Sequence, residues 1–517
     1  MSLRHYVSLA SVRVRFAPSP TGFLHLGGLR TAFFNYLFAR KNKGKFILRI
    51  EDTDQKRLKP GSVENLYSML QWTGLVPDES PFVGGSYGPY IQSQRLNLYQ
   101  EKVEELIKTG SAYRCFCSET RLDILKKEAL RQHSNWGYDN KCRNLDATEI
   151  ENFLKEDKPY TIRFKIPKGS VTHKDMVFGT QTYDVSENEG DFIIMKSDGF
   201  PTYHFACVVD DHLMQISHVL RGTEWLISTP KHILMHQALG WEPPTFAHLP
   251  LLTNSDRTKL SKRQDSIGIE NFKEKGYSSI ALLNFLANAG GGFGKQEGCI
   301  NYDLETLSSK FNLENVNMGS CIVDLRKLDL FNHNYLIQQL SSETSASNLI
   351  KDLRKLLKKK YGLRYEKEEV NLSDSYIKKI ILCYKDRMNT LEHLTGPDME
   401  YLWTTVEWDD ILEKIATLKI QDSVLSSLKT VSRILSSMPE SEFTGEKLNV
   451  KLKDMCKELN LKYSALMRAL RVLLTAQKDG PGVAEILEML GQKRTLEKIK
   501  FVTEKFENQR KSSICNT

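Results

Sequence analysis

The stretch that most constrains the fold is a strand-like run, then a loop rich in proline and glycine, then a helical pattern. Val12–Phe16 alternates as a β-strand does, and Leu29–Lys41 places its apolar residues on one helix face. Between them, Pro18–Gly28 contains two prolines, three glycines and His25. A strand, a glycine-bearing loop and a helix N-terminus together direct backbone N–H groups at phosphate. The loop matches neither the dinucleotide pattern nor the P-loop pattern, so we expect a different kind of α/β nucleotide site.

A second positively charged segment lies far along the chain. Lys259–Arg263, which reads K-L-S-K-R, follows an apolar run that ends at Leu252. Its three cations suit a polyphosphate, although a charge run taken alone is more often a solvated loop. Its meaning therefore depends on the His25 loop.

Taken together, the two segments resemble the H-x-G-H/G and K-M-S-K-S signatures of class I aminoacyl-tRNA synthetases. Further segments narrow the resemblance to glutamyl-tRNA synthetases of the bacterial and organellar type. These segments are Arg15–Gly22, Arg49–Asp54, Gly88–Tyr90, Pro201–His204 and Asp210–His212. The resemblance covers nearly the whole chain and is most specific from Arg13 to Arg263.

The resemblance implies a multidomain α/β protein with a Rossmann-like catalytic domain in two halves. Between the halves it implies an α+β module that contacts the acceptor end of the tRNA, and after them an all-α anticodon-binding region. The residue patterns agree, because short strands alternate with helices early in the chain and nearly everything after residue 331 has a helical pattern. The expected domains are 12–93 (first catalytic half), 94–200 (inserted module), 201–330 (second catalytic half with the K-L-S-K-R loop and a stem-contact region) and 331–517 (anticodon-binding region).

By resemblance, the chain attaches L-glutamate to tRNA-Glu through a glutamyl-adenylate, with ATP as the second substrate. The amino-acid carboxylate attacks the α-phosphorus of ATP, so the protein must position both substrates and neutralise growing phosphate charge. Mg²⁺ is expected to enter on the ATP phosphates and not in a protein cage. The expected catalytic residues are His25, Lys259 and Lys262. A lone histidine beside an apolar helix is more often structural, but the surrounding loop favours a phosphate contact here.

The remaining site residues are implied by the resemblance. Two guanidinium groups, Arg15 and Arg221, would favour glutamate over glutamine, because an amide NH₂ would face other donors. Glu51 would take the ammonium group. The expected glutamate-binding residues are Arg15, Phe16, Ala17, Ser19, Glu51, Tyr203, Cys207, Arg221 and Trp225. The expected ATP-binding residues are His25, Gly27, Gly28, Glu224, Lys259, Leu260, Ser261, Lys262 and Arg263.

Two departures from the family pattern stand out. Cys207 replaces an asparagine common in bacterial relatives, and a thiol is the weaker hydrogen-bond partner. Cysteines 115, 117 and 142 resemble the zinc site of some bacterial members, but Asn144 stands where the family has histidine. Three thiolates without a fourth ligand make a poor zinc site, although His133 is a conceivable replacement. We therefore expect no metal, and cysteines that pack as apolar residues.

Other expectations concern the partners and the location of the chain. The net charge of +8 is compatible with an RNA partner, no apolar run is long enough for a membrane span, and nine cysteines without regular spacing indicate a reducing compartment. Residues 1–12 contain arginine and serine but no acid, as transit peptides do. We expect the mitochondrial matrix, or otherwise a bacterial cytoplasm, and a monomer. By resemblance, Arg387 reads the anticodon.

Three alternatives differ in the features that they require. A shortened paralogue that glutamylates a modified tRNA base would lack the helical C-terminal half. A non-catalytic tRNA-binding protein would be expected to lose His25, Glu51 or the lysine-bearing loop, and all are present. The Arg15–Arg221 pair argues against a glutamine-charging enzyme. Whether tRNA-Gln also receives glutamate stays open.

Overall fold

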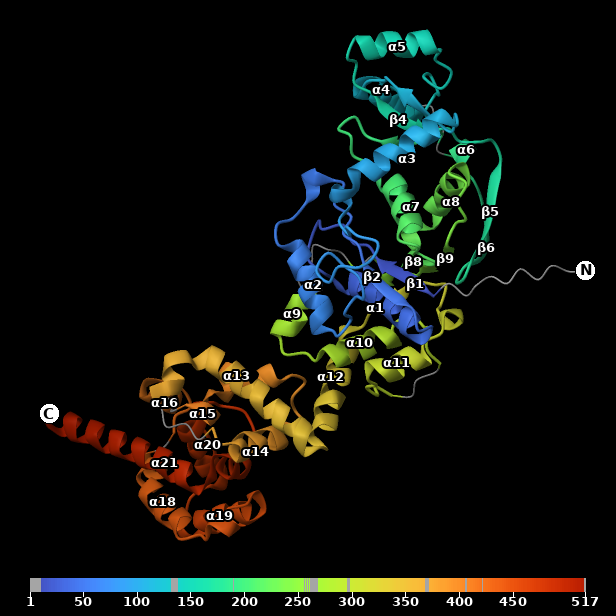
Figure 1. The fold of residues 1–517 in the computed structure, drawn as a ribbon. Coiled ribbons are helices and arrows are strands. Elements are labelled where there is room, and N and C mark those ends of the chain that lie inside the picture. Colours follow the sequence, from blue (N-terminus) through green and yellow to red (C-terminus); the bar gives the residue numbers. More distant parts are fainter. Residues whose placement is uncertain are drawn as a thin grey trace, which may run out of the picture. The chain divides into compact units, whose positions relative to one another are not determined.

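The computed structural model divides the chain into two compact units, Met1–Asn332 and His333–Thr517 (Figure 1). It describes residues 11–131, 138–188, 190–254, 256, 258, 260, 268–294, 298–367, 372–404, 407–420 and 422–515. The first unit mixes strands and helices, and the described part of the second unit is helical. The predicted division of the first unit into two catalytic halves and an insertion stays a prediction.

The first unit contains the strands and most of the short helices. Its strands are β1 (Arg13–Phe16), β2 (Lys45–Leu48), β3 (Ala112–Cys115), β4 (Thr161–Phe164), β5 (Ser170–Asp175), β6 (Gly179–Asp184), β7 (Ile193–Met195), β8 (His218–Gly222), β9 (Thr245–Leu249), β10 (Leu252–Thr253) and β11 (Cys321–Ile322). Its helices are α1 (Leu26–Lys41), α2 (Ser62–Trp72), α3 (Leu96–Lys108), α4 (Glu119–Arg131), α5 (Ala147–Lys155), α6 (Val185–Asn188), α7 (Tyr203–Leu213), α8 (Thr229–Ala238), α9 (Ile269–Glu274), α10 (Ser279–Asn288), α11 (Leu304–Lys310) and α12 (Leu325–Leu340), which crosses into the second unit.

Parallel strands form the centre of the first unit (Figure 1). β1 pairs with β2, and β8 pairs with β9, both in parallel. Ser217, just before β8, donates its backbone N–H to the Arg13 carbonyl at 3.0 Å and so joins β8 to β1. β5 is parallel to β9 at its last residue and antiparallel to β6. Since parallel strands end at the same edge of a sheet, the loops after β1 and β2 lie together there.

Helix α1 begins three residues earlier than its apolar pattern indicates. The His25 side chain caps it, because Nδ1 accepts the backbone N–H of Gly28 at 3.2 Å. Gly27 and Gly28 therefore belong to the first helical turn and not to the loop. A Cβ atom on Gly27 would lie 3.2 Å from the His25 ring, which explains the glycine. The predicted start at Leu29 was wrong because the pattern of apolar residues does not reveal a histidine cap.

The run Tyr160–Ile166 has the residue pattern of a strand, and the structure has β4 within it. It lies between β3 and β7 in an antiparallel sheet. Val103 of α3, Ile162 of β4 and Ile194 of β7 share one apolar core with Phe205 of α7 and Met235 of α8. This shared core fixes α7, which carries several of the predicted site residues, against the sheet.

The second unit is a helical assembly around one large apolar core. Its helices after α12 are α13 (Glu343–Lys367), α14 (Asp374–Tyr384), α15 (Glu400–Trp403), α16 (Trp408–Thr417), α17 (Asp422–Ser426), α18 (Leu428–Ser436), α19 (Gly445–Glu458), α20 (Tyr463–Thr475) and α21 (Val483–Cys515). Trp403, Tyr401 and Leu470 are among its buried members. The predicted all-α character is confirmed for the described residues.

Candidate active site

A buried network of charges lies at the end of β2 and on α7. Arg15 donates from Nε to Asp211 at 3.0 Å, and Arg49 donates from Nη1 to the same carboxylate oxygen at 2.7 Å. Arg49 also donates from Nη2 to Glu51 at 3.1 Å. All four residues are at most 5% exposed. Buried charges of this kind persist only when they are paired and hydrogen-bonded, so the arrangement is rigid.

The two carboxyl groups of this network differ in their pKa values. Burial pushes the pKa of Asp211 up, but Arg15 and Arg49 outweigh burial and hold that pKa below its usual range. For Glu51, burial dominates over Arg49 and Arg15, so its pKa is raised. An additional cation that binds beside Glu51 would therefore stabilise its charged form.

Cys207 is completely buried beside the same network. Its Sγ lies 3.6 Å from Arg15 Nη2 and 3.5 Å from Arg49 Nη2. Burial raises the pKa of Cys207 to about 12, so the group is a neutral thiol at physiological pH. The cysteine fills this position without adding a charge.

A separate buried cation, Arg221, ends β8 on the other side of Tyr203. It is 4% exposed, and its Nη1 donates to the Tyr203 hydroxyl at 3.4 Å. Tyr203 packs against Trp225 in a tilted arrangement, with ring centroids 4.2 Å apart. Burial raises the pKa of Tyr203, and the charges of Arg221, Glu51 and Arg15 all act on its hydroxyl. Two of the predicted pocket residues, Arg221 and Trp225, thus contact this tyrosine.

The loop with His25 is joined to Gly268 and Ile269, which follow the K-L-S-K-R segment in the sequence. His25 forms a backbone bridge with Gly268, and Ile269 donates its N–H to the Leu24 carbonyl at 2.9 Å. Leu260, the described member of the K-L-S-K-R loop, donates its N–H to the Leu252 carbonyl at 3.5 Å. The predicted ATP-binding residues Lys259, Ser261, Lys262 and Arg263 lie outside the described residues.

The other predicted site residues occupy several environments. Phe16 is buried at the end of β1, Ala17 is partly buried, and Ser19 and Glu224 are exposed. These residues flank the Arg15 and Arg221 ends of the site. The structure does not bring Arg387 into a buried cluster, since it forms an exposed ion pair with Glu485 at 3.0 Å in the second unit. Their binding roles stay predictions.

Sequence reasoning assigned no role to four residues that shape the site. Arg49 pairs with Asp211 and Glu51, and His232, His248 and Asp175 surround Arg221, directly or through one another. Arg49 lies in the R-I-E-D-T-D segment, two residues before Glu51, so side-chain alternation along a strand places both on one face. The histidines carry no comparable local signal, because the pairing of β8 with β9 brings His248 to Arg221, and His232 reaches it from helix α8.

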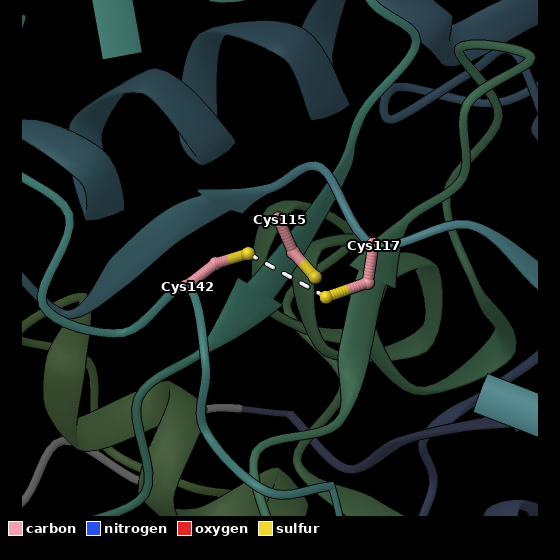
Figure 2. A group of neighbouring side chains, drawn as sticks. All are labelled: Cys115, Cys117 and Cys142. Carbon is pink, nitrogen blue, oxygen red and sulfur yellow. Dashed lines mark hydrogen bonds between the residues drawn. The ribbon is translucent and has the colours of Figure 1, made fainter. Parts of the chain in front are cut away.

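Cysteines 115, 117 and 142 gather in space, as the resemblance implied. Their sulfur atoms all lie within 4.8 Å of one another, and those of Cys117 and Cys142 are 3.6 Å apart (Figure 2). Cys115 and Cys142 are buried, and Cys117 is half-buried. Within the described ranges this is the one group of three or more metal-ligating side chains.

The fourth corner of this cluster is a phenol and not a usual zinc ligand. The Tyr138 hydroxyl lies 3.3 Å from the Cys115 sulfur and 3.5 Å from that of Cys117, and it accepts the Cys142 backbone N–H at 3.0 Å. Asn144 is exposed, and His133 lies outside the described residues. The described donors therefore supply three corners of a zinc tetrahedron and lack a histidine or carboxylate for the fourth. That the cluster holds no zinc stays a prediction.

Comparison with protein families decides the class of the chain. Residues 11–330 match the family described as tRNA synthetases class I (E and Q), catalytic domain. The chain belongs to this family. Residues 348–503 of the synthetase match a second description, anticodon binding domain. The catalytic match covers the whole Arg15, Glu51, Arg221 region, and the second match lies within the helical unit.

Individual relatives agree over nearly the full length of the synthetase. It is 40% identical over 500 residues to the glutamate–tRNA ligase of Chlorobium luteolum, which covers 95% of this chain and 97% of the relative. The ligase of Clostridioides difficile is 36% identical over 509 residues. A crystal structure of the Elizabethkingia meningosepticum glutamate tRNA ligase in complex with its amino acid superimposes with a TM-score of 0.79 at 32% identity, covering 96% of this chain and 99% of that one. No helix in the described part of the synthetase has the length and apolar content needed to cross a membrane.

Below about pH 6.5 the buried histidines should lower the free energy of unfolding of the synthetase. Burial lowers the pKa of His204 to about 3 and of His236 to about 4, and it lowers the pKa of His232 and His248. As the pH falls through about 6.5, these histidines bind protons in the unfolded chain but stay neutral in the folded chain. The free energy of unfolding therefore decreases. Each histidine that stays neutral in the folded chain at pH 5 lowers the free energy of unfolding by about 2 kcal/mol. Unfolding by urea at pH 7.5, 6.5 and 5.5 measures this loss.

Glu51 acts in the opposite sense, since its raised pKa means that the folded chain binds a proton before the unfolded chain does. Because this single carboxyl group opposes four histidines, the net effect of acid is still a decrease in the free energy of unfolding. A urea midpoint that stays constant or rises between pH 7.5 and 5.5 would show that the histidines are not held neutral.

Proposed function

We propose that the chain is a glutamate–tRNA ligase whose amino-acid pocket lies between Glu51 and Arg221. The observation that carries the proposal is the pair of opposite buried charges around Tyr203. Arg221 is buried without an ion-paired carboxylate among the described residues, and Glu51 has a raised pKa. A ligand with a carboxylate at one end and an ammonium group at the other complements both.

Glutamate offers the right set of charges for this pocket. Its side-chain carboxylate would meet Arg221, with Arg15 Nη1 as a second donor, since Asp211 takes the other Arg15 nitrogens. Its ammonium group would meet Glu51 and lower the pKa of that carboxyl group. Glutamine would present an amide NH₂ to guanidinium donors, so the pocket would reject it. The relatives named glutamate–tRNA ligase support this choice of substrate.

The first chemical step is adenylate formation. The α-carboxylate of glutamate attacks the α-phosphorus of ATP in line, and diphosphate leaves. His25 would donate to a phosphate oxygen: its Nδ1 accepts the Gly28 N–H, so a neutral ring carries its proton on Nε2. Lys259 and Lys262 would neutralise the departing diphosphate, and Mg²⁺ would arrive on the ATP phosphates.

The second step transfers the glutamyl group to tRNA. A ribose hydroxyl at the tRNA terminus attacks the carbonyl of the mixed anhydride, and AMP leaves. The helical unit would bind the anticodon, with Arg387 as a contact, because residues 348–503 match an anticodon binding domain. The non-catalytic alternative is not favoured, since the full catalytic region is present.

We further propose a monomer in the mitochondrial matrix. The first twelve residues carry arginine, histidine and serine without an acid, which supports import. Organelles often make Gln-tRNA from a Glu-tRNA-Gln intermediate, so tRNA-Gln is proposed as a second acceptor of glutamate.

Charging of purified tRNAs tests the proposal. The chain, ATP and Mg²⁺ are mixed separately with tRNA-Glu and tRNA-Gln, each with radiolabelled glutamate or glutamine. We expect glutamate on tRNA-Glu and no glutamine on either tRNA. Glutamate on tRNA-Gln would support the second acceptor, and its absence would restrict the enzyme to tRNA-Glu. Attachment of glutamine, or of no amino acid, would overturn the substrate assignment.

A further inference from the structure

Arg221 is held by neutral groups alone. Its Nη2 donates to the Thr229 hydroxyl at 2.9 Å and to the Trp225 carbonyl at 3.3 Å. Among the described residues no carboxylate forms an ion pair with it, whereas the neighbouring Arg15 is paired directly with Asp211. The two buried arginines therefore differ. Among the described residues Arg15 has a carboxylate partner and Arg221 has none.

Two histidines accept hydrogen bonds from the same guanidinium. Arg221 Nε lies 3.1 Å from His248 Nε2, and Arg221 Nη1 lies 3.3 Å from His232 Nδ1. A guanidinium has donors and no acceptor, so each of these ring nitrogens must present a lone pair. Both imidazoles are therefore neutral, and the proton of each is on its other nitrogen.

The outer nitrogens of both rings also have partners. His248 Nδ1 lies 2.7 Å from Asp175 Oδ2, and His232 Nε2 lies 3.1 Å from His204 Nδ1. Asp175 is in turn fixed, because its other oxygen accepts the backbone N–H groups of Val177 and Phe178, both at 2.9 Å. Asp175 and His248 are at most 1% exposed. The carboxylate thus fixes the tautomer of His248, as acceptors behind functional imidazoles do.

The sheet creates this line of contacts. Arg221 in β8 and His248 in β9 are register partners in a parallel pair, and β5 joins β9 at its last residue, Asp175. The three side chains therefore follow one another across three neighbouring strands. Rigid strands hold a binding group more accurately than loops do.

We propose that Asp175 and His248 are positioning residues that orient Arg221 for the side-chain carboxylate of the amino-acid substrate without neutralising it. The proposal rests on the assignment of Arg221 to that carboxylate. A carboxylate placed directly on Arg221 would take both arms of its fork and compete with the ligand, as Asp211 does at Arg15. Asp175 orients the neutral His248 ring, and that ring orients Arg221. The ring also separates the negative charge of Asp175 from the guanidinium.

Two conservative substitutions of His248 separate positioning from simple packing. In His248→Gln the longer side chain can place an oxygen near the position of Nε2 and still accept from Arg221. In His248→Asn the shorter side chain reaches Asp175 but not Arg221. His218→Gln is the control, because His218 starts β8, the strand of Arg221, but contacts the Ser217 hydroxyl instead of Arg221.

The readout is the tRNA-dependent ATP–pyrophosphate exchange rate at varied glutamate and varied ATP. We expect His248→Asn to raise the KM for glutamate about tenfold or more, with the KM for ATP within about twofold of the wild type. His248→Gln should recover most of the glutamate KM, and His218→Gln should leave both KM values unchanged. Thermal unfolding of each variant shows which of them fold.

Arg221→Gln in the same assay separates this proposal from the one beneath it. If Arg221→Gln leaves the glutamate KM unchanged, the pocket assignment itself fails. If Arg221→Gln raises that KM but both His248 variants behave as the wild type, positioning by His248 is wrong. Equal loss in the Gln and Asn variants, or an equal rise in the KM for ATP, would also overturn it, because packing alone predicts that pattern.

Discussion

Replacing Arg221 by glutamine should lower kcat/KM for glutamate by about a hundredfold or more and leave the KM for ATP nearly unchanged. The substitution removes a buried cation that faces the substrate carboxylate, and loss of one partner of a buried charge pair costs about 2–5 kcal/mol. Because no carboxylate of the described residues forms an ion pair with Arg221, the substitution leaves none of them without a partner. Exchange kinetics at varied glutamate and varied ATP measure the two effects separately.

Two further variants accompany Arg221→Gln. Arg221→Lys keeps the charge but not the planar fork, so it should lie between the wild type and the glutamine variant. Arg57→Gln removes an exposed arginine whose side chain is 73% accessible. It should leave the kinetics with glutamate and with ATP unchanged. Unchanged glutamate kinetics in Arg221→Gln would refute the pocket, and an equal loss for ATP would indicate general damage.

Replacing Lys262 by alanine should slow glutamyl-adenylate formation by about a hundredfold with little change in tRNA affinity. The lysine would neutralise charge that grows on the leaving diphosphate, and removal of one such group costs about 10²–10³ in rate. Gly268, six residues after Lys262 in the sequence, forms a backbone bridge with His25, which supports this role. Single-turnover adenylate formation and a tRNA filter-binding titration provide the two readouts.

Lys275→Ala is the matched control, since Lys275 is exposed at the end of α9 and lies outside the loop. It removes the same charge and should leave adenylate formation at the wild-type rate. A Lys262→Ala enzyme that forms adenylate normally would remove the lysine from the phosphate site. A parallel loss of tRNA affinity would indicate that the loop serves the RNA instead.

Much of the local structure is predictable from residue spacing. The helical pattern of Ser62–Trp72 matches α2, and the apolar run Phe46–Ile50 predicts a strand that differs from β2 by one residue at its start and two at its end. α2 buries Leu66, Met69 and Leu70 at helical spacing, and the last three residues of β2 are all buried, so apolar residues indicate both elements. α1 shows the limit of the method, since its start depends on a side-chain cap at His25 that periodicity does not detect.

The binding pocket was predictable only in part. Arg15, Glu51, Tyr203 and Arg221 lie in segments that resemble a known family, and in the structure Arg221 contacts Tyr203 while Arg15 and Glu51 belong to one buried charge network. The partners that adjust their charges come from strands and helices far apart in sequence. Asp175, for example, reaches the site only because β5 pairs with β9. Single-sequence reasoning contains no term for such pairing.

A crystal structure of the chain with a non-reactive analogue of glutamyl-adenylate tests the central claim most directly. We predict that the side-chain carboxylate lies within hydrogen-bond distance of Arg221, that the ammonium group contacts Glu51, and that His25 and Lys262 meet the phosphate mimic in the same cleft. An analogue bound away from Arg221 and Glu51, or a lysine-bearing loop that stays remote from His25 with the analogue bound, would contradict the account.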